Sequence, residues 1–157
     1  MQYRLYNAID FDNLYAIEMV CFKPPVRFTR GYMRRLVQAP NGATWIAENE
    51  DRMAGFAIVE WTRQDDGLIA YLQTIEVRPE ARGLGVGGEL LRRVENSARQ
   101  AGATLLWLHV EARNDGALRL YEAHGFRSIG LTKNYYGRNR AALVYEKPLK
   151  PATASLS

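Results

Sequence analysis

The sequence predicts a single α/β domain in which helices flank one mixed β-sheet. Three observations predict this class. Segments with the alternating pattern of strands recur along the chain, apolar stripes with helical spacing lie between them, and no long linker divides the chain. With 157 residues and 47% apolar content, the chain is long enough to bury one core. We expect the domain to span residues 1–149 and residues 150–157 to form a disordered tail.

The N-terminal half is expected to supply a strand, two helices and a hairpin. Residues 3–7 ("YRLYN") alternate as a strand does. Asp10 or Asp12 is placed to cap a helix that ends near Phe22, and Thr29 is placed to cap a second helix. The hairpin strands are "ATWIAEN" (43–49) and "MAGFAIVEWT" (53–62), because a polar segment joins these two apolar runs.

The C-terminal half continues to alternate strands and helices. Apolar residues draw a helical stripe from Val86 to Ala101, and Gly102 follows where a helix often ends on a left-handed residue. Asn114 or Asp115 is placed to cap a short helix that Gly125 ends. The remaining segments are expected to be strands: 68–77, 104–110, 126–136 and 141–149.

Composition limits where the protein works and what it binds. Cys21 is the one cysteine, so no intrachain disulfide forms, and the first residues lack the apolar core of a signal peptide. We therefore expect a cytoplasmic protein with no membrane partner, and we expect Cys21 to fill the core, because no base lies near it in sequence. The net charge of +4 is mild and its basic residues are scattered, so no nucleic-acid partner is expected. Binding of an anionic small ligand would explain part of this excess of positive charge as well as nucleic-acid binding would.

A glycine-rich segment, "RPEARGLGVGG" (78–88), precedes and enters the predicted helix 86–101. Glycine costs backbone entropy on folding, so clustered glycines indicate left-handed dihedral angles or close approach by another group. A flexible loop is the simplest interpretation. The letters Gly83-x-Gly85-x-x-Gly88 also fit a dinucleotide-binding motif, but the preceding strand alternates and the chain lacks room for repeated βαβ units. A P-loop is excluded, because no Lys-Ser or Lys-Thr follows the last glycine.

A third pattern in the same segment is Arg82-x-x-Gly85-x-Gly87 at the start of an amphipathic helix. Backbone amides of residues 83–88 would converge on a pyrophosphate there, and the helix dipole would favour its negative charge. "NDGALRLYEAHGF" (114–126) and "TKNYYGRNRAALVYEKPL" (132–149) follow it. Together these motifs resemble the GCN5-related N-acetyltransferases (GNAT). The resemblance runs from about Tyr3 to Leu149 and is most specific from Tyr71 to Phe126.

This resemblance implies a GNAT fold with splayed central strands and acetyl-coenzyme A as the cosubstrate, with no metal. Within the superfamily, the motifs are similar to protein N-terminal acetyltransferases, both the bacterial RimI type, which modifies a ribosomal protein, and the catalytic subunit of the eukaryotic NatE type. The resemblance therefore implies transfer of acetyl to the N-terminal α-amine of a protein or peptide, by direct attack in a ternary complex. It implies a monomer or a weak dimer. One departure is His109, which stands where RimI-type proteins carry a glutamate as the proposed base.

The resemblance also implies which residues hold the cosubstrate. The pyrophosphate would lie on the glycine segment, the pantetheine arm along residues 74–77, and the sulfur near Tyr121. The backbone N–H of Ile75 is a candidate oxyanion donor. The implied set comprises Ile75, Val77, Arg82, Gly83, Leu84, Gly85, Val86, Gly87, Gly88, Asn114 and Tyr121.

Three residues are implied in catalysis, and each has a structural alternative. His109 would be a general base acting through a water with Tyr71, or a histidine satisfied within the sheet. Tyr71 would orient water and substrate, or be an ordinary strand aromatic. Tyr121 would protonate the leaving thiolate, or pack in the core. His124, at a helix end, is expected to be structural.

The walls of the peptide slot are implied in the same way. Tyr135 and Tyr136 would form one wall and meet the backbone of the incoming N-terminus, unless their hairpin merely packs its aromatics. Phe22, Pro25, Val26 and Tyr71 complete the implied set, although the segment at 22–26 carries one or two residues more than the family's Phe-Pro-x.

Two other functions remain open from the sequence. A small-molecule amine acetyltransferase, acting on a polyamine, amino acid or antibiotic, would favour an acidic cleft, whereas "KNYYGRNR" (133–140) is basic. A regulatory module that only binds coenzyme A would need neither His109 nor Tyr121.

Overall fold

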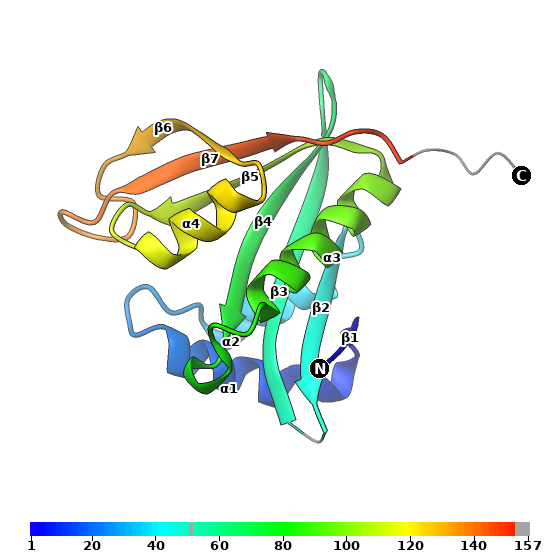
Figure 1. Ribbon diagram of the computed structural model, residues 1–157, viewed down its shortest axis with the longest axis vertical. Helices are drawn as coiled ribbons and strands as arrows, with labels where there is room; N and C mark the ends of the chain where they lie inside the picture. Colours follow the sequence, from blue (N-terminus) through cyan, green and yellow to red (C-terminus); the bar gives the residue numbers. More distant parts are fainter. Residues whose placement is uncertain (51, 153–157) are drawn as a thin grey trace, which may run out of the picture.

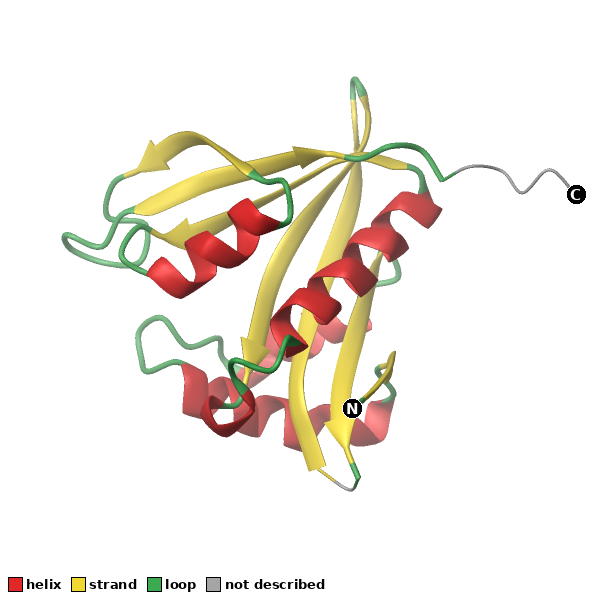
Figure 2. Ribbon diagram, in the orientation of Figure 1, coloured by secondary structure: helices red, strands yellow, loops and turns green. Residues whose placement is uncertain are grey.

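The computed structural model describes residues 1–50 and 52–152, which fold around one seven-stranded mixed sheet (Figures 1 and 2). The expected α/β class is confirmed. The strands are β1 (Gln2–Leu5), β2 (Gly42–Asn49), β3 (Arg52–Gln64), β4 (Gly67–Val77), β5 (Ala103–Glu111), β6 (Arg127–Thr132) and β7 (Ala142–Pro148). The helices are α1 (Phe11–Cys21), α2 (Arg30–Gln38), α3 (Val86–Ala101) and α4 (Asp115–Ala123), with short 3-10 turns η1 (Ala8–Asp10) and η2 (Pro79–Ala81). The expected tail falls largely on residues 153–157, which lie outside the described residues, so the division at residue 149 stays a prediction.

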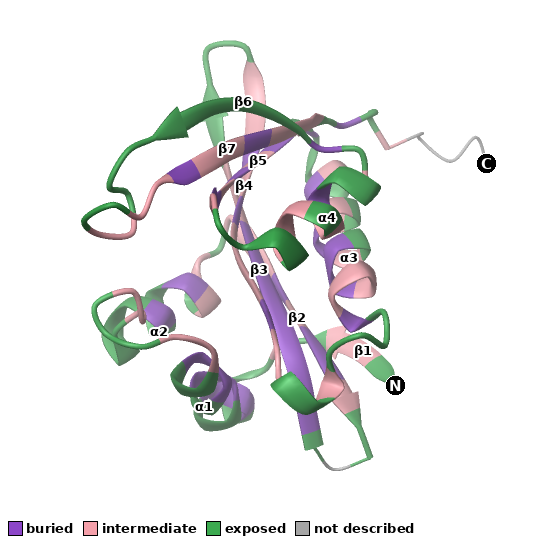
Figure 3. Cartoon of the chain, turned by 60° about the vertical axis from the view of Figure 1, so that its left-hand side comes forward, coloured by how far each residue is buried: buried purple, intermediate pink, exposed green. Residues whose placement is uncertain are grey.

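The sheet order is β1-β2-β3-β4-β5-β7-β6, and β4 and β5 are its parallel pair. Helices α1 and α2 cover one face, whereas α3 and α4 cover the other (Figure 3). The alternation along β3 separates two cores: Phe56 and Ile58 face α1 and α2, and Ala57 and Val59 face α3. Both faces of β3 are therefore buried, which explains why its sequence is an apolar run.

Most helix ends follow their expected caps. The Thr29 hydroxyl accepts from Tyr32 N at 3.1 Å, and Gly102 takes a left-handed φ of 100° after α3. Asp10 occupies the expected N-cap position of α1, but its side chain makes no capping hydrogen bond there. Asn7 caps η1, which leads into α1, and the Asp10 carboxylate instead accepts from the backbone of Asn7 and binds Arg4.

The feature that positions the site is the divergence of β4 from β5. Their pairing runs from Leu68 and Ala103 to Tyr71 and Trp107 and then stops, although both strands continue. On its other side β4 carries a bulge, since Ile58 pairs with Thr74 and Val59 pairs with Leu72. A bulge bends a strand and re-aims its side chains. The splayed central strands expected from the family resemblance are therefore present.

Candidate active site

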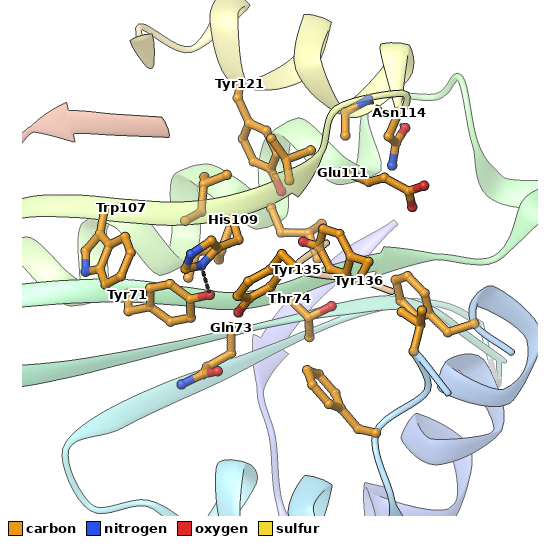
Figure 4. A pocket seen from close by; sticks show the side chains of 18 of the residues that line it. Tyr71, Gln73, Thr74, Trp107, His109, Glu111, Asn114, Tyr121, Tyr135 and Tyr136 are labelled. Atoms are coloured by element: carbon orange, nitrogen blue, oxygen red, sulfur yellow. Dashed lines mark hydrogen bonds between the residues drawn. The ribbon is translucent and has the colours of Figure 1, made fainter. Parts of the chain in front are cut away.

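A cavity of about 430 Å³ lies where β4 and β5 separate, and loops from both ends of the chain complete its walls (Figure 4). The α1–α2 loop closes one side and the β6–β7 loop the other. Half of the site residues expected from the sequence line it together. They are Phe22, Val26, Tyr71, Ile75, His109, Asn114, Tyr121, Tyr135 and Tyr136.

His109 lies between two tyrosines at the point of divergence. Its Nδ1 is 2.7 Å from the hydroxyl of Tyr71, and the Tyr135 ring stacks on the imidazole with centroids 4.1 Å apart (Figure 4). The Tyr136 ring meets Tyr135 edge-on, with centroids 4.9 Å apart. The β6–β7 loop therefore reaches back over the imidazole on β5.

Burial sets the protonation of this group. Burial lowers the pKa of His109, because desolvation penalises the imidazolium, so the ring is neutral near neutral pH. Burial, and then contact with the Tyr135 hydroxyl, raises the pKa of Tyr71 well above its ordinary value. A phenol that holds its proton so firmly is a poor base. Of the two, His109 is therefore the better proton acceptor.

Tyr121 and Asn114 reach the cavity from α4. Burial raises the pKa of Tyr121, and among the described residues its hydroxyl has no hydrogen-bond partner. Figure 4 shows this hydroxyl directed between the strands. Asn114 caps α4 through Oδ1, which accepts from Ala117 N at 3.2 Å, so its side-chain N–H groups are not used by the cap. Tyr121 therefore carries its proton at neutral pH and can donate a hydrogen bond into the gap between the strands.

The glycine segment lies outside this cavity, beyond the end of β4. Gly83 and Gly85 have φ of 79° and 82°, and a side chain at either would meet no atom within 4 Å. They are glycines because the turn is left-handed. Across residues 1–50 and 52–152, the backbone amides from Gly83 to Gly88 find no acceptor, and Glu89 N is the first to donate within α3. Unpartnered amides at a helix N-terminus fit a pyrophosphate.

Gly87 and Gly88 are glycines for a different reason, which is lack of space for a side chain. A Cβ on Gly88 would lie 3.1 Å from His124 Nε2, and one on Gly87 would lie 3.5 Å from Leu120. Their missing side chains let α3 pack closely against α4. The close approach in this half of the segment is therefore to the protein itself, which also gives His124 the structural place expected for it.

Besides residues 83–88, three expected residues lie away from the cavity. Pro25 is exposed and does not line it, because the α1–α2 loop turns its Phe22 and Val26 inward instead. Val77 lies at the end of β4, past the lining. The Arg82 side chain turns back, where Nε donates to the Val77 carbonyl at 3.0 Å and Nη2 contacts Cys21 Sγ at 3.6 Å. Burial raises the pKa of that thiol, which agrees with a packing role for Cys21.

Six polar or aromatic lining residues had no sequence prediction: Glu18, Phe28, Tyr32, Gln73, Trp107 and Glu111. Trp107 could have been found, since it shares a strand face with His109 two residues on. The Glu111 carboxylate accepts from Nε and Nη2 of Arg140, at 3.1 and 2.8 Å. Glu18 carried no local signal. No group of three or more His, Cys, Asp or Glu suited to a metal occurs in the part of the chain that the structure describes.

These observations define a class: a mixed sheet with a split central pair, unpartnered amides at a helix start, and a neutral histidine in the split. Residues 11–126 match the acetyltransferase (GNAT) family, and the chain belongs to it. The protein is an acetyl-coenzyme A-dependent N-acetyltransferase. Among the described residues no helix is both long and apolar enough to span a membrane.

Particular relatives refine the class. The chain is 30% identical to the ribosomal protein bS18-alanine N-acetyltransferase of Haemophilus influenzae, over 88% of this chain and 92% of that one. The crystal structure of the ribosomal-protein-S18-alanine N-acetyltransferase from Escherichia coli is 26% identical, with a TM-score of 0.82 over 99% of this chain and 98% of that chain. The chain is also 37% identical to streptothricin acetyltransferase of Streptomyces lavendulae, over 59% of this chain and 49% of that protein.

Proposed function

We propose that this protein transfers the acetyl group of acetyl-coenzyme A to the N-terminal α-amine of a protein or peptide. The observation that carries the proposal is the neutral His109 at the floor of a slot walled by aromatic residues. Similarity to two ribosomal-protein alanine N-acetyltransferases supports it. A ribosomal protein N-terminus is accordingly one candidate substrate.

The lining residues suit direct transfer. The amine nitrogen forms a bond to the acetyl carbonyl carbon as the carbon–sulfur bond breaks. His109, through a water, would take the proton that the amine loses, and Tyr121 would give its proton to the departing sulfur. The N–H of Ile75 would stabilise the negative charge on the carbonyl oxygen. Holding both substrates in one cavity supplies much of the rate, so no acyl-enzyme is required.

The cosubstrate would occupy the gap between β4 and β5. Its pyrophosphate would meet the amides of residues 83–88, and its pantetheine arm would follow β4 past Thr74, with Asn114 opposite. The unpartnered amides and the unpaired stretch of β4 support this placement. The Arg82 guanidinium would have to leave the Val77 carbonyl before it could contact phosphate.

The type of amine follows from acidity. At pH ~7.5 roughly a third of α-amines, with pKa about 7.7–8.0, are neutral, against about 0.1% of lysine side chains. A lysine substrate would need an extra ~3.4 kcal/mol from deprotonation or desolvation. The carboxylates near the cavity do not supply that help, because Glu111 is neutralised by Arg140 and Glu18 is fully buried. A neutral histidine is sufficient for an α-amine.

A second candidate is acetylation of a small-molecule amine, which the likeness to streptothricin acetyltransferase favours. The two candidates separate in one experiment. Purified protein, acetyl-coenzyme A and equal concentrations of a free-N-terminus peptide, a polyamine and streptothricin are incubated together, and products are quantified by mass spectrometry. The proposal expects the peptide product to dominate. A dominant small-molecule product would replace it with the second candidate.

A further inference from the structure

Two carboxyl groups lie buried beside the acceptor side of the cavity, and the acetyl-transfer steps use neither. Glu18, on α1, is 0% exposed, and Glu76, on β4, is 2% exposed. Oε1 of each has no hydrogen-bond partner among the described residues. Neither carboxylate forms an ion pair in that part of the chain.

The two carboxyl groups are neighbours, because Glu18 is the largest influence on the pKa of Glu76 after burial itself. If both carboxyl groups were ionised, the two negative charges would repel each other. Both Oε1 atoms would also lack a hydrogen-bond donor, which is costly in a buried site. A single proton shared by the two Oε1 atoms would give each of them a hydrogen-bond partner. Burial, followed by the carboxyl group of Glu18, raises the pKa of Glu76, which agrees with a proton retained there.

The outer oxygens of the pair connect two walls of the cavity. Glu18 Oε2 accepts from Phe28 N at 2.9 Å, and Glu76 Oε2 accepts from Thr74 Oγ1 at 2.8 Å. The Phe28 carbonyl is held in turn by the hydroxyl of Tyr15, at 2.8 Å. Phe28 and Thr74 both line the cavity. Hydrogen bonds therefore join the α1–α2 loop to Glu18 and β4 to Glu76, and among the described residues no hydrogen bond joins the two carboxyl groups to each other.

We propose that Glu18 and Glu76 are positioning residues, whose single shared proton ties the α1–α2 loop (residues 22–29) to β4 and sets the acceptor slot. The proton stays on the pair throughout the reaction, and neither residue touches the reacting atoms. The identity of the acceptor as a peptide rests on the proposed function, whereas the carboxyl pair does not.

The surroundings determine the direction of the pH effect. The Cys21 thiol of α1 faces Glu76, the Arg82 guanidinium reaches that thiol, and the β3 neighbour of Glu76 in register is the apolar Phe56. Within residues 1–50 and 52–152, no Lys, Arg or His side chain forms an ion pair with either carboxyl group. Because the pKa of Glu76 is raised in the folded protein, the stability it contributes is fully present below the unfolded pKa. It is lost as the pH rises through the raised value.

The first test looks for the proton without any acceptor. Infrared spectra of the folded protein at neutral pH should contain a protonated carboxylic acid band that is absent from both Glu18→Gln and Glu76→Gln. Asp12→Asn, an exposed carboxyl on the same helix, should keep the band. Absence of the band from the wild type, or its survival in both glutamine variants, would overturn the shared proton whatever the substrate is.

The second test asks whether the link between the α1–α2 loop and β4 affects binding of the acceptor. Glu76→Gln supplies an amide donor to Glu18 and cannot ionise, whereas Glu76→Ala leaves Glu18 Oε1 without a donor. We expect Glu76→Ala to raise the KM for the best acceptor about tenfold or more, with the KM for acetyl-coenzyme A little changed. Glu76→Gln should restore the acceptor KM. An alanine variant with lower stability but an unchanged acceptor KM would overturn the positioning role.

The third test covers an alanine variant that does not fold. As the pH rises, the wild type should lose melting temperature and acceptor affinity relative to Glu76→Gln, because only the wild type can place a second charge in the pair. Superimposable pH profiles for the two proteins would overturn the proposal. Since any productive acceptor serves, including a small amine, these outcomes are distinguishable from failure of the proposed function.

Discussion

The hydroxyl oxygen of Tyr71 lies 2.7 Å from Nδ1 of His109, and this contact bears on which imidazole nitrogen can accept a proton. For Nε2 to act as the base, Nδ1 must carry the hydrogen and donate it to the tyrosine oxygen. The raised pKa of Tyr71 keeps its own proton available for another partner. The pair therefore works as a base and its orienting group.

Replacing His109, the proposed base, should lower kcat more than replacing Tyr71. His109→Ala should lower kcat by about 10² or more, because a positioned general base contributes at least that factor. The loss should shrink as the pH rises, since more of the amine then arrives deprotonated. Steady-state kinetics across pH check this prediction, and a wild-type rate at neutral pH would return His109 to a structural role.

The wild-type pH profile carries its own signature. Since burial lowers the pKa of His109, the imidazole stays neutral to lower pH than a free histidine does, and it is lost as a base only below that lowered value. The folded protein also favours the neutral ring. The contribution of His109 to the free energy of unfolding therefore falls as the pH drops below about 6.5, the pKa of a histidine in the unfolded chain. NMR titration of the ring measures the shift. A pKa at or above 6.5 would contradict the account of its environment.

Tyr71→Phe should lower kcat by about tenfold, less than His109→Ala does, because it removes the orienting partner and keeps the base. In a His109→Ala background the same change should add little, since the two residues act as a unit. A double-mutant cycle on kcat checks this. Fully additive losses would mean that Tyr71 acts independently of His109.

Tyr121→Phe should slow departure of the thiolate while leaving coenzyme A binding intact, since only the hydroxyl is lost and it has no partner among the described residues. Calorimetry for binding and kcat for turnover separate the two effects. Equal kcat in both proteins would assign Tyr121 to packing against Phe126 and Tyr145.

The glycine segment gives a matched pair of variants. Gly85→Ala should destabilise the protein by about 1–2 kcal/mol, because φ is 82° there, and should weaken coenzyme A binding by turning the amides. Gly31→Ala on α2, where a side chain meets no atom within 4 Å, should be neutral or slightly stabilising. Unchanged coenzyme A affinity in Gly85→Ala, measured by calorimetry, would contradict the proposal that the amides of residues 83–88 bind the pyrophosphate.

The fold was predictable from sequence where local patterns decide it. The stripe from Val86 to Ala101 gave the bounds of α3, and Gly102 its end, because both depend on neighbours along one helix. Thr29 and Asn114 cap as expected for the same reason. Asp10 does not, since its salt bridge to Arg4 across the β1–η1 turn outweighs a capping bond.

The site was less predictable, because it depends on contacts between distant segments. The reason for Gly88 appears only once α4 places His124 against it. The bulge in β4 and the outward turn of Pro25 have no sequence signal. Glu18 and Glu76 are far apart in the sequence, and nothing in either neighbourhood indicates that their carboxyl groups meet. The motifs at Arg82 and "NDGALRLY" predicted the class of reaction, and the match to the acetyltransferase (GNAT) family confirmed it.

On the proposed function, the amine that reacts is a free protein N-terminus. Phe22, Tyr135 and Tyr136 line the slot and would hold an apolar first residue, Met above all, while the tyrosine hydroxyls meet the backbone. A panel of short peptides assayed by mass spectrometry tests this most directly. Peptides with free Met or other apolar first residues should react at least about ten times faster than N-terminally blocked peptides containing lysine, as the difference in amine pKa requires. If blocked lysine peptides or free polyamines outpace every free N-terminus, the claim is contradicted.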